Sequence, residues 1–250
     1  MKVDIIIPIY KSNLTFLDAS LKSCIEQTYK DINIVAVVDG CDLDYSTIFN
    51  KYGIVPIVLD KNYGPGYARN FAIKNSSSEI ISFLDSDDIM LKDKIAKAVA
   101  LFKSKKEVDL TCGNYKLIIN GKANKTFFNG KLSIDYNKML KINYVASGST
   151  SIRRSVFEKI TNDRGYFFDE RYRIAEDYSA WLEIARIGAE KNISNIVFDT
   201  EPLYLYRISN DGSSLYFNKE NRDKEAEILS IIKSESRERM AEFENKKEKN

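Results

Sequence analysis

Short apolar runs alternate with helix-like segments through the first hundred residues of this chain. The runs at 3–9, 32–38, 54–59 and 80–84 are rich in isoleucine, valine and leucine and predict buried strands. Between the first two, residues 14–25 place leucine and isoleucine at the spacing of one helical face. Strands that alternate with helices across short links predict an α/β fold: a Rossmann-like, mostly parallel central sheet with helices on both faces.

An acidic cluster follows the fourth apolar run. Asp85, Asp87 and Asp88 lie within four positions of one another, and burial disfavours such a group because like charges repel and ionised carboxylates lose hydration. A divalent cation would relieve this, and Mg²⁺ or Mn²⁺ prefers oxygen ligands, one or two carboxylates together with phosphate oxygens being typical of Mg²⁺. The alternative is that Asp87 or Asp88 only caps a helix that begins at residue 89.

Three of the predicted strands end in residues suited to binding a polar ligand. Pro8 and Tyr10 end the first run, Asp39 ends the second, and the acidic cluster ends the fourth. In open parallel sheets, ligands bind beyond the carboxyl ends of the strands. We therefore expect these residues to converge on one edge of the sheet, which helix capping alone does not explain.

The composition argues against several classes of function. The net charge of +2 is too small to argue for a nucleic-acid partner, and no apolar run is long enough to cross a bilayer. Because the chain contains no histidine, Ser-His-Asp and Cys-His catalysis and His-based zinc sites are excluded. Acid–base chemistry would therefore fall to Asp, Glu, Lys or Tyr. Three scattered cysteines are typical of reduced thiols, which favours a cytoplasmic protein.

The second half of the sequence is less regular. It contains a hairpin signal at Asn120-Gly121, a small polar loop at 147–150 that we expect to be flexible, and a helical pattern over 178–187. From residue 219 onward, dense mixed charges accompany apolar residues at roughly helical spacing. This segment predicts either a charged helix that packs on the domain or on a neighbouring copy, or a helix that lies on a membrane surface.

A series of short motifs runs through the chain. The motifs are Ile5-Ile6-Ile7-Pro8-Ile9-Tyr10, Asp39-Gly40, the segment 62–70 that ends in Ala68-Arg69-Asn70, Asp85-Ser86-Asp87-Asp88, Glu176-Asp177 followed by Trp181, and Tyr206-Arg207 followed by Ser213. In this order, over residues 3–215, they resemble the motifs of the family 2 glycosyltransferases, which have a GT-A fold. Each motif alone is a weak signal, but the ordered set is specific.

The resemblance implies transfer of a sugar, with inversion, from a nucleoside diphosphate sugar to a hydroxyl. It implies a glycan or a lipid-linked saccharide as acceptor, in synthesis of a bacterial-type surface polysaccharide, and we expect a UDP-sugar as donor. On the family's pattern Asp87 would hold Mn²⁺ or Mg²⁺, and Asp177 would be the general base for the acceptor hydroxyl. The nucleotide-sugar would be bound by Pro8, Tyr10, Asp39, Arg69, Asp85 and Ser86, and the acceptor by Gly148, Ser149, Glu176 and Trp181.

The same resemblance implies how the chain is divided and where it acts. Residues 1–110 would form the nucleotide-sugar-binding half of a GT-A domain and 111–217 the half that holds the acceptor and the catalytic base. Residues 218–250 would be a charged helical extension. We expect a cytoplasmic protein, with peripheral association at the inner face of the membrane, or an oligomer, formed through that extension.

Two departures from the family's pattern leave other functions open. Val38 stands where the family usually has a first Asp, and Ser209 stands where many relatives have a His that ligates the metal or the diphosphate. Asp211 or water would then replace that histidine. One alternative function is a non-catalytic protein that binds nucleotide-sugars or serves as a scaffold. A second is a Mg²⁺-dependent phosphotransferase with Asp85 as nucleophile.

Overall fold

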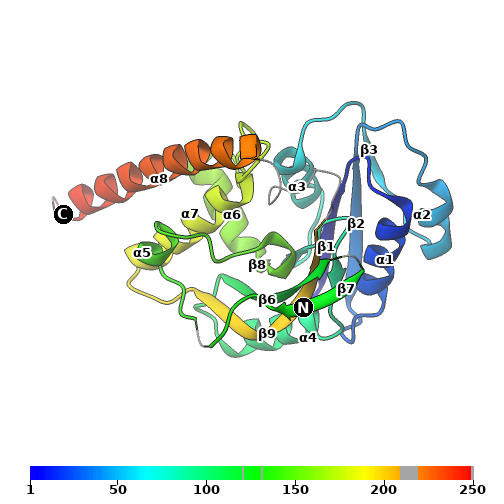
Figure 1. Ribbon diagram of the computed structural model, residues 1–250. Coiled ribbons are helices and arrows are strands. Elements are labelled where there is room, and N and C mark those ends of the chain that lie inside the picture. The colour runs from blue at the N-terminus through cyan, green and yellow to red at the C-terminus, as the bar shows by residue number, and fades with distance from the viewer. Residues whose placement is uncertain (120, 131, 209–218, 249–250) are drawn as a thin grey trace.

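One sheet runs through the computed structural model, which describes residues 1–119, 121–130, 132–208 and 219–248 (Figure 1). Within those residues the strands pair in the order β3-β2-β1-β4-β8-β6-β9-β5, with β7 beside β6. The strands are β1 (Val3–Ile9), β2 (Ile32–Asp39), β3 (Ile57–Leu59), β4 (Ile80–Phe83), β5 (Ile89–Met90), β6 (Leu110–Ile119), β7 (Lys122–Thr126), β8 (Ser151–Arg153) and β9 (Ile196–Arg207). The helices are α1 (Leu14–Ile25), α2 (Ser46–Tyr52), α3 (Pro65–Lys74), α4 (Lys94–Ser104), α5 (Tyr136–Met139), the 3₁₀ turn η1 (Ser147–Ser149), α6 (Arg154–Arg164), α7 (Glu176–Glu190) and α8 (Lys219–Glu248).

The first part of the sheet is parallel, as the alternating pattern predicts. β1 pairs in parallel with β2 on one side and with β4 on the other, and β3 pairs in parallel with β2. β8 pairs antiparallel with both β4 and β6, while β6 and β9 are again parallel, so the sheet is mixed beyond β4. The carboxyl ends of β1, β2 and β4 therefore lie side by side at one edge.

Helices cover both faces of the sheet, and β1 shows how the sequence directs this. Successive residues of a strand point to opposite faces. Ile5 and Ile7 belong to a buried cluster that includes Leu17 of α1 and Ile95 of α4. Ile6 belongs to a second buried cluster, formed with residues of α3, α6 and α7. Because both faces are covered, β1 is a continuous apolar run rather than an alternating one.

The prediction of a helix that begins at Ile89 is wrong. Ile89–Met90 instead forms the short strand β5, which pairs antiparallel with β9, and α4 begins only at Lys94. Asp88 does not cap α4, because its side chain accepts the backbone N–H of Arg207 at 2.8 Å. The short strand and this hydrogen bond together attach the acidic cluster to the last strand of the sheet.

The expected flexible loop at 147–150 is instead a buried turn. Ser147, Ser149 and Thr150 are buried. The hydroxyl of Ser149 donates to the Ala146 carbonyl at 2.8 Å, and the hydroxyl of Thr150 donates to the Ser147 carbonyl at 2.8 Å. A small polar segment can be buried in this way because its hydroxyl groups keep hydrogen-bond partners.

The charged C-terminal segment forms α8, which packs on α7 and ends at Glu248 (Figure 1). This confirms the expectation of a helix that packs on the domain. In the described part of the chain, no helix combines the length and the apolar character needed to cross a membrane. Ser209, Asp211 and Ser213, which the motif comparison singles out, lie outside the described residues.

Candidate active site

A cavity of about 780 Å³ opens at the edge where β1, β2 and β4 end. Its wall includes Pro8 and Tyr10 at the end of β1, Asp39 at the end of β2, and Asp85 and Ser86 after β4. The expected convergence of these strand ends on one edge is therefore observed. The wall also includes four residues from other parts of the sequence: Arg69, Gly148, Glu176 and Asp177.

Arg69 joins two of the carboxylates in this cavity. It lies on α3, is 4% exposed, and donates to Glu176 Oε1 and to Asp85 Oδ1, each at 2.6 Å. Burial raises the pKa of Glu176 to about 7, although the nearby guanidinium acts in the opposite direction. An opposite charge at this distance favours the ionised form of a carboxyl group. Arg69 thus connects the acidic cluster after β4 with the first turn of α7.

Asp177 is held in one orientation beside that pair. Its Oδ2 accepts the hydroxyl of Ser147 at 2.8 Å, and its Oδ1 accepts the backbone N–H of Tyr178 at 2.7 Å. Burial raises the pKa of Asp177, while Arg69 and the Ser147 hydroxyl lower it by a smaller amount. A carboxylate with a raised pKa binds a proton more strongly than an ordinary aspartate, which suits a general base.

The backbone is strained immediately before these two acids. Ala175 has φ 60° and ψ 16°, the left-handed region, which costs a non-glycine residue about 1–2 kcal/mol. Such conformations persist where the surrounding structure determines them, and they cluster at functional sites. Here the left-handed residue precedes α7, and the first two residues of that helix, Glu176 and Asp177, both line the cavity.

Asp39 supports the loop that leads into α3. Its carboxylate is buried and accepts the backbone N–H of Tyr63 at 2.8 Å and that of Gly64 at 2.7 Å. Each carboxylate oxygen has more than one acceptor site, so both retain capacity for a further donor from the cavity. The role expected for Asp39 in binding a nucleobase stays a prediction.

The acidic cluster provides oxygen ligands but no preformed metal cage. Within the described residues, no group of three or more His, Cys, Asp or Glu side chains is arranged to hold a metal. Asp85 is paired with Arg69, and one oxygen of buried Asp88 has no hydrogen-bond partner in the described part of the chain. Asp87 is partly exposed, and its backbone carbonyl accepts Nε of Arg207 at 2.8 Å. These residues fit Mg²⁺ or Mn²⁺ bound jointly by Asp87 and the oxygens of a diphosphate.

Two residues expected at the acceptor lie away from this cavity, and a third is tightly packed. Trp181 is fully buried, with Phe83 and Phe168 beside it, so it belongs to the core. Ser149 is buried and lines a different cavity. Gly148 does line the active-site cavity, but a Cβ on it would lie 2.6 Å from the ring of Tyr204. The backbone of Gly148 therefore lies directly against that ring.

Apart from Tyr206, which belongs to the Tyr206-Arg207 motif, the sequence patterns do not single out the aromatic wall of the cavity or two residues of α8 that also line it. Asn221 and Glu225 come from the first turns of α8. Strand alternation places Tyr204 and Tyr206 on one face of β9, but alternation does not say whether that face meets a core or a cavity. The aromatic wall consists of Tyr115, Phe127, Phe128, Tyr144, Tyr204 and Tyr206.

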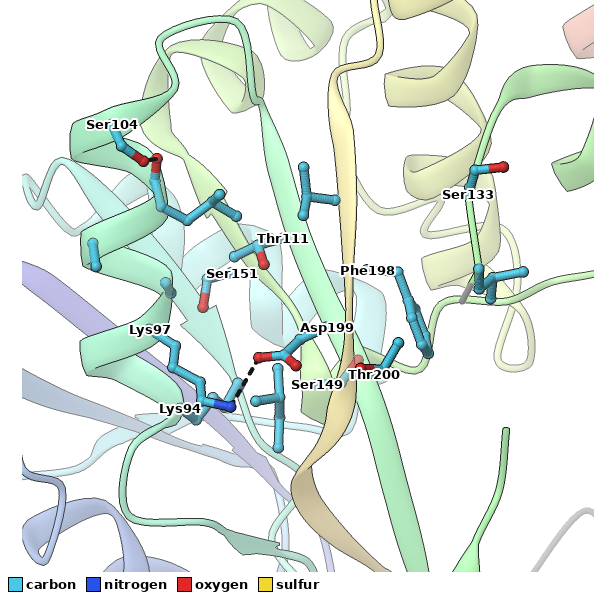
Figure 2. A pocket seen from close by; sticks show the side chains of 16 residues that line it. Lys94, Lys97, Ser104, Thr111, Ser133, Ser149, Ser151, Phe198, Asp199 and Thr200 are labelled. Atoms are coloured by element: carbon cyan, nitrogen blue, oxygen red, sulfur yellow. Dashed lines mark hydrogen bonds and ion pairs between the residues drawn. The ribbon is translucent and has the colours of Figure 1, made fainter. Parts of the chain in front are cut away.

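A second cavity, of about 970 Å³, lies between α4 and the strands β6 and β9 (Figure 2). Lys97 of α4 reaches Asp199 of β9 at 3.0 Å beside it. Lys94 is buried here and donates to the Ser82 hydroxyl and to the Phe83 carbonyl, each at 2.9 Å. Apart from Ser149, no residue expected at the site lines this cavity, whereas most of the expected residues line the smaller one. Asp87 and Trp181 line neither cavity.

Comparison with known proteins places the chain in a family. The profile of glycosyl transferase family 2 matches residues 4–161, more than half of the sequence. The chain belongs to glycosyl transferase family 2. This family 2 chain is 31% identical over 202 residues to the UDP-Glc:alpha-D-GlcNAc-diphosphoundecaprenol beta-1,3-glucosyltransferase WfaP of Escherichia coli, a match that covers 78% of the chain and 74% of WfaP.

A second relative is longer than the family 2 chain. The chain is 30% identical over 216 residues to the uncharacterized glycosyltransferase RT0329 of Rickettsia typhi, and the match covers 82% of the chain. The chain spans only 64% of the length of that relative.

The fold of the family 2 chain matches that of a solved structure. The crystal structure of S. aureus TarS 1-349 in complex with UDP-GlcNAc aligns with a TM-score of 0.69 at 22% identity, covering 98% of this chain and 72% of that chain. At this identity the likeness concerns the fold alone, and it confirms the predicted GT-A fold class.

Proposed function

We propose that this chain is an inverting, metal-dependent glycosyltransferase that moves a sugar from a nucleoside diphosphate sugar to a hydroxyl of a saccharide acceptor. One observation supports this most directly. Asp177, a partly buried carboxylate oriented by Ser147, shares a cavity with the ends of β1, β2 and β4. Membership of family 2 supports the class of reaction.

Asp177 acts as the general base in this proposal. The acceptor hydroxyl must lose a proton as it attacks the anomeric carbon, and a positioned carboxylate contributes about 10²–10⁴ in rate. The raised pKa of Asp177 favours proton uptake, and the hydrogen bonds from Ser147 and Tyr178 fix the direction of its two oxygens. Attack on the face opposite the leaving diphosphate inverts the anomeric configuration.

In this proposal the acidic cluster stabilises the leaving group. Asp87 would hold Mn²⁺ or Mg²⁺, which would supply positive charge against the negative charge that develops on the departing diphosphate. Arg69 holds Asp85 at the ribose side of the nucleotide, while Arg207 holds the backbone of Asp87. The chain thereby keeps the metal-binding carboxylate and the base on separate segments, the turn between β4 and β5 and the first turn of α7.

The relatives favour a particular class of substrates. The name of WfaP specifies UDP-glucose and a diphosphoundecaprenol-linked GlcNAc, and TarS was crystallised with UDP-GlcNAc. We infer a UDP-sugar donor and a lipid-linked saccharide acceptor for this chain, with the nucleobase among Pro8, Tyr10 and Asp39. A lipid-linked acceptor would place a cytoplasmic protein at the inner face of a membrane, in surface polysaccharide synthesis.

Sugar transfer by the purified protein tests this function. The donors are radiolabelled UDP-glucose and UDP-GlcNAc, each with Mn²⁺, and the acceptor is a synthetic GlcNAc-diphospholipid. We expect transfer with inversion, and a fall in kcat of about 10²–10⁴ for Asp177→Asn with donor binding retained. Asp87→Ala should lose the dependence on Mn²⁺. Asp163→Asn, an exposed carboxylate on α6, serves as the control and should behave as wild type.

Three other outcomes would contradict the proposal. Equal transfer by wild type, Asp177→Asn and Asp87→Ala would reject the assigned chemistry. Donor binding without transfer to any acceptor would favour a non-catalytic nucleotide-sugar-binding protein. A trapped aspartyl-phosphate at Asp85 would favour a phosphotransferase, although the carboxylate of Asp85 is already paired with Arg69.

A further inference from the structure

The first turns of α8 form part of the active-site wall. Asn221 and Glu225 line the cavity, while Ile232, Ser236 and Arg239 of the same helix contact the body of the protein. Neighbouring members of this set are three, four or seven residues apart, which is the spacing of one helical face. The face of α8 that packs on the domain is thus the face that reaches the cavity.

Contacts farther along α8 fix its rotation. Ile232 is 1% exposed, the hydroxyls of Ser236 and Tyr136 lie 3.1 Å apart, and Arg239 donates to Glu183 of α7 at 3.2 Å. Figure 1 shows α8 as one continuous helix in orange and red. Because a helix is stiff, these anchors determine where Glu225 lies, about two turns before Ile232.

Glu225 is suited to receive hydroxyl donors from a ligand. Its carboxylate has no hydrogen-bond or ion-pair partner among the residues that the structure describes. Partial burial raises the pKa of Glu225, and the charge of Asp177 adds to this effect, so the two carboxylates influence each other. A partly desolvated carboxylate without donors is unfavourable, and two sugar hydroxyls can satisfy its two oxygens.

We propose that Glu225 is a specificity-determining residue that binds hydroxyls of the acceptor sugar next to the hydroxyl deprotonated by Asp177. This inference rests on the proposed function, because it takes the acceptor to be a saccharide. The donor side of the cavity would be formed by the ends of β1 and β2, with Pro8 and Asp39. Glu225 instead lines the cavity from α8, which packs on α7, the helix whose first turn carries Asp177. We therefore assign Glu225 to the acceptor rather than to the nucleotide.

Steady-state kinetics with donor and acceptor varied separately test this assignment. The proteins are wild type, Glu225→Gln and Glu225→Ala, with UDP-glucose and UDP-GlcNAc as donors and the synthetic GlcNAc-diphospholipid as acceptor. We expect the acceptor KM to rise about 10- to 100-fold, because a hydrogen bond to a charged group is lost, while the donor KM stays unchanged. Glu227→Gln is the matched control, since Glu227 is exposed on the same helix and does not line the cavity.

The outcomes separate this inference from the proposed function. An unchanged acceptor KM in both Glu225 variants, or an equal rise in Glu227→Gln, overturns the role of Glu225 and leaves the glycosyltransferase function standing. A parallel rise in donor KM also overturns the assignment. No transfer by wild type overturns the proposed function, and the inference with it. The thermal midpoint of each variant and its binding of UDP show whether a loss of transfer activity reflects misfolding. If Glu225→Ala misfolds, the acceptor KM of Glu225→Gln, the smaller change, decides the role of Glu225.

Discussion

Asp85, Glu176 and Asp177 share the surroundings of a single guanidinium, that of Arg69. Arg69 donates at 2.6 Å to each of the first two, and its charge also lowers the pKa of Asp177. Buried carboxylates normally lose ionisation, yet the proposed reaction needs at least one ionised base. The balance between burial and one cation therefore sets the protonation of the whole group.

Removing the guanidinium of Arg69 should lower the free energy of unfolding. Arg69→Met leaves two carboxylates without their partner in a buried site, and we expect a loss of about 3–5 kcal/mol in the free energy of unfolding. Urea titration measures it. Lys159→Met removes a cation from an exposed pair and should cost about 0–1 kcal/mol. Similar losses in the two variants would show that Arg69 does not compensate buried charge.

Lys94 should make the free energy of unfolding depend on pH in the neutral to alkaline range. Burial lowers the pKa of Lys94 from 10.5 to about 7. Between these values the folded amine is neutral and the unfolded amine is charged, so folding releases a proton and the free energy of unfolding rises with pH. Lys94→Met should reduce that slope by up to about 1.4 kcal/mol per pH unit.

Unfolding in urea from pH 7 to pH 10 measures this slope. The control is Lys92→Met, because Lys92 is exposed two residues earlier and should leave the slope as in wild type. A slope that is the same in Lys94→Met and in wild type would mean that the buried amine keeps its proton throughout this range.

At the scale of elements, the turn after β2 places Asp39 against the next loop. Gly40 has φ +56°, and a Cβ on it would lie 2.0 Å from the backbone carbon of Lys61. The backbone after β2 and the backbone after β3 therefore approach each other without room for a side chain. The same approach allows Asp39 to reach the N–H groups of Tyr63 and Gly64.

Substitutions at two glycines test how much stability depends on the close approach of the two backbone segments at Gly40. Gly40→Ala combines a left-handed backbone with a collision against backbone atoms, and we expect a loss of more than about 3 kcal/mol, at the high end for single substitutions. Gly53→Ala has a similar φ of +64° but nothing within 4 Å, so it should cost only about 1–2 kcal/mol. Thermal or urea unfolding compares them, and equal losses would show that backbone conformation alone is responsible.

For the molecule as a whole, binding of the nucleotide should be linked to folding. UDP at about 100 times its Kd should stabilise the protein by about 2.7 kcal/mol, seen as a higher thermal midpoint. Mn²⁺ should increase the shift, because Asp87 and the diphosphate would bind it together, and EDTA should remove that increase. Asp87→Ala should show the shift with UDP but no increase with Mn²⁺. An increase that persists in Asp87→Ala would place the cation elsewhere.

Local sequence patterns were sufficient to predict the alternating strands and helices and the edge of the sheet at which polar residues gather. The β1, β2 and β4 strands are recognisable because each is a short apolar run whose pattern depends on near neighbours. The parallel arrangement then brings Pro8, Asp39 and Asp85 to one cavity without further information. The ordered motifs indicated the family, because each motif is a short stretch of local sequence.

Contacts between residues that are distant in the sequence depend instead on how the chain packs. Ile89 and Met90 form a strand because β9 is beside them, and Trp181 is in the core because α7 packs against aromatic residues from other elements. The pairing of Arg69 with Glu176 and the approach of Glu225 to the cavity likewise join segments far apart in the chain. Local patterns carry no record of such contacts, because they depend on how the helices pack around the finished sheet.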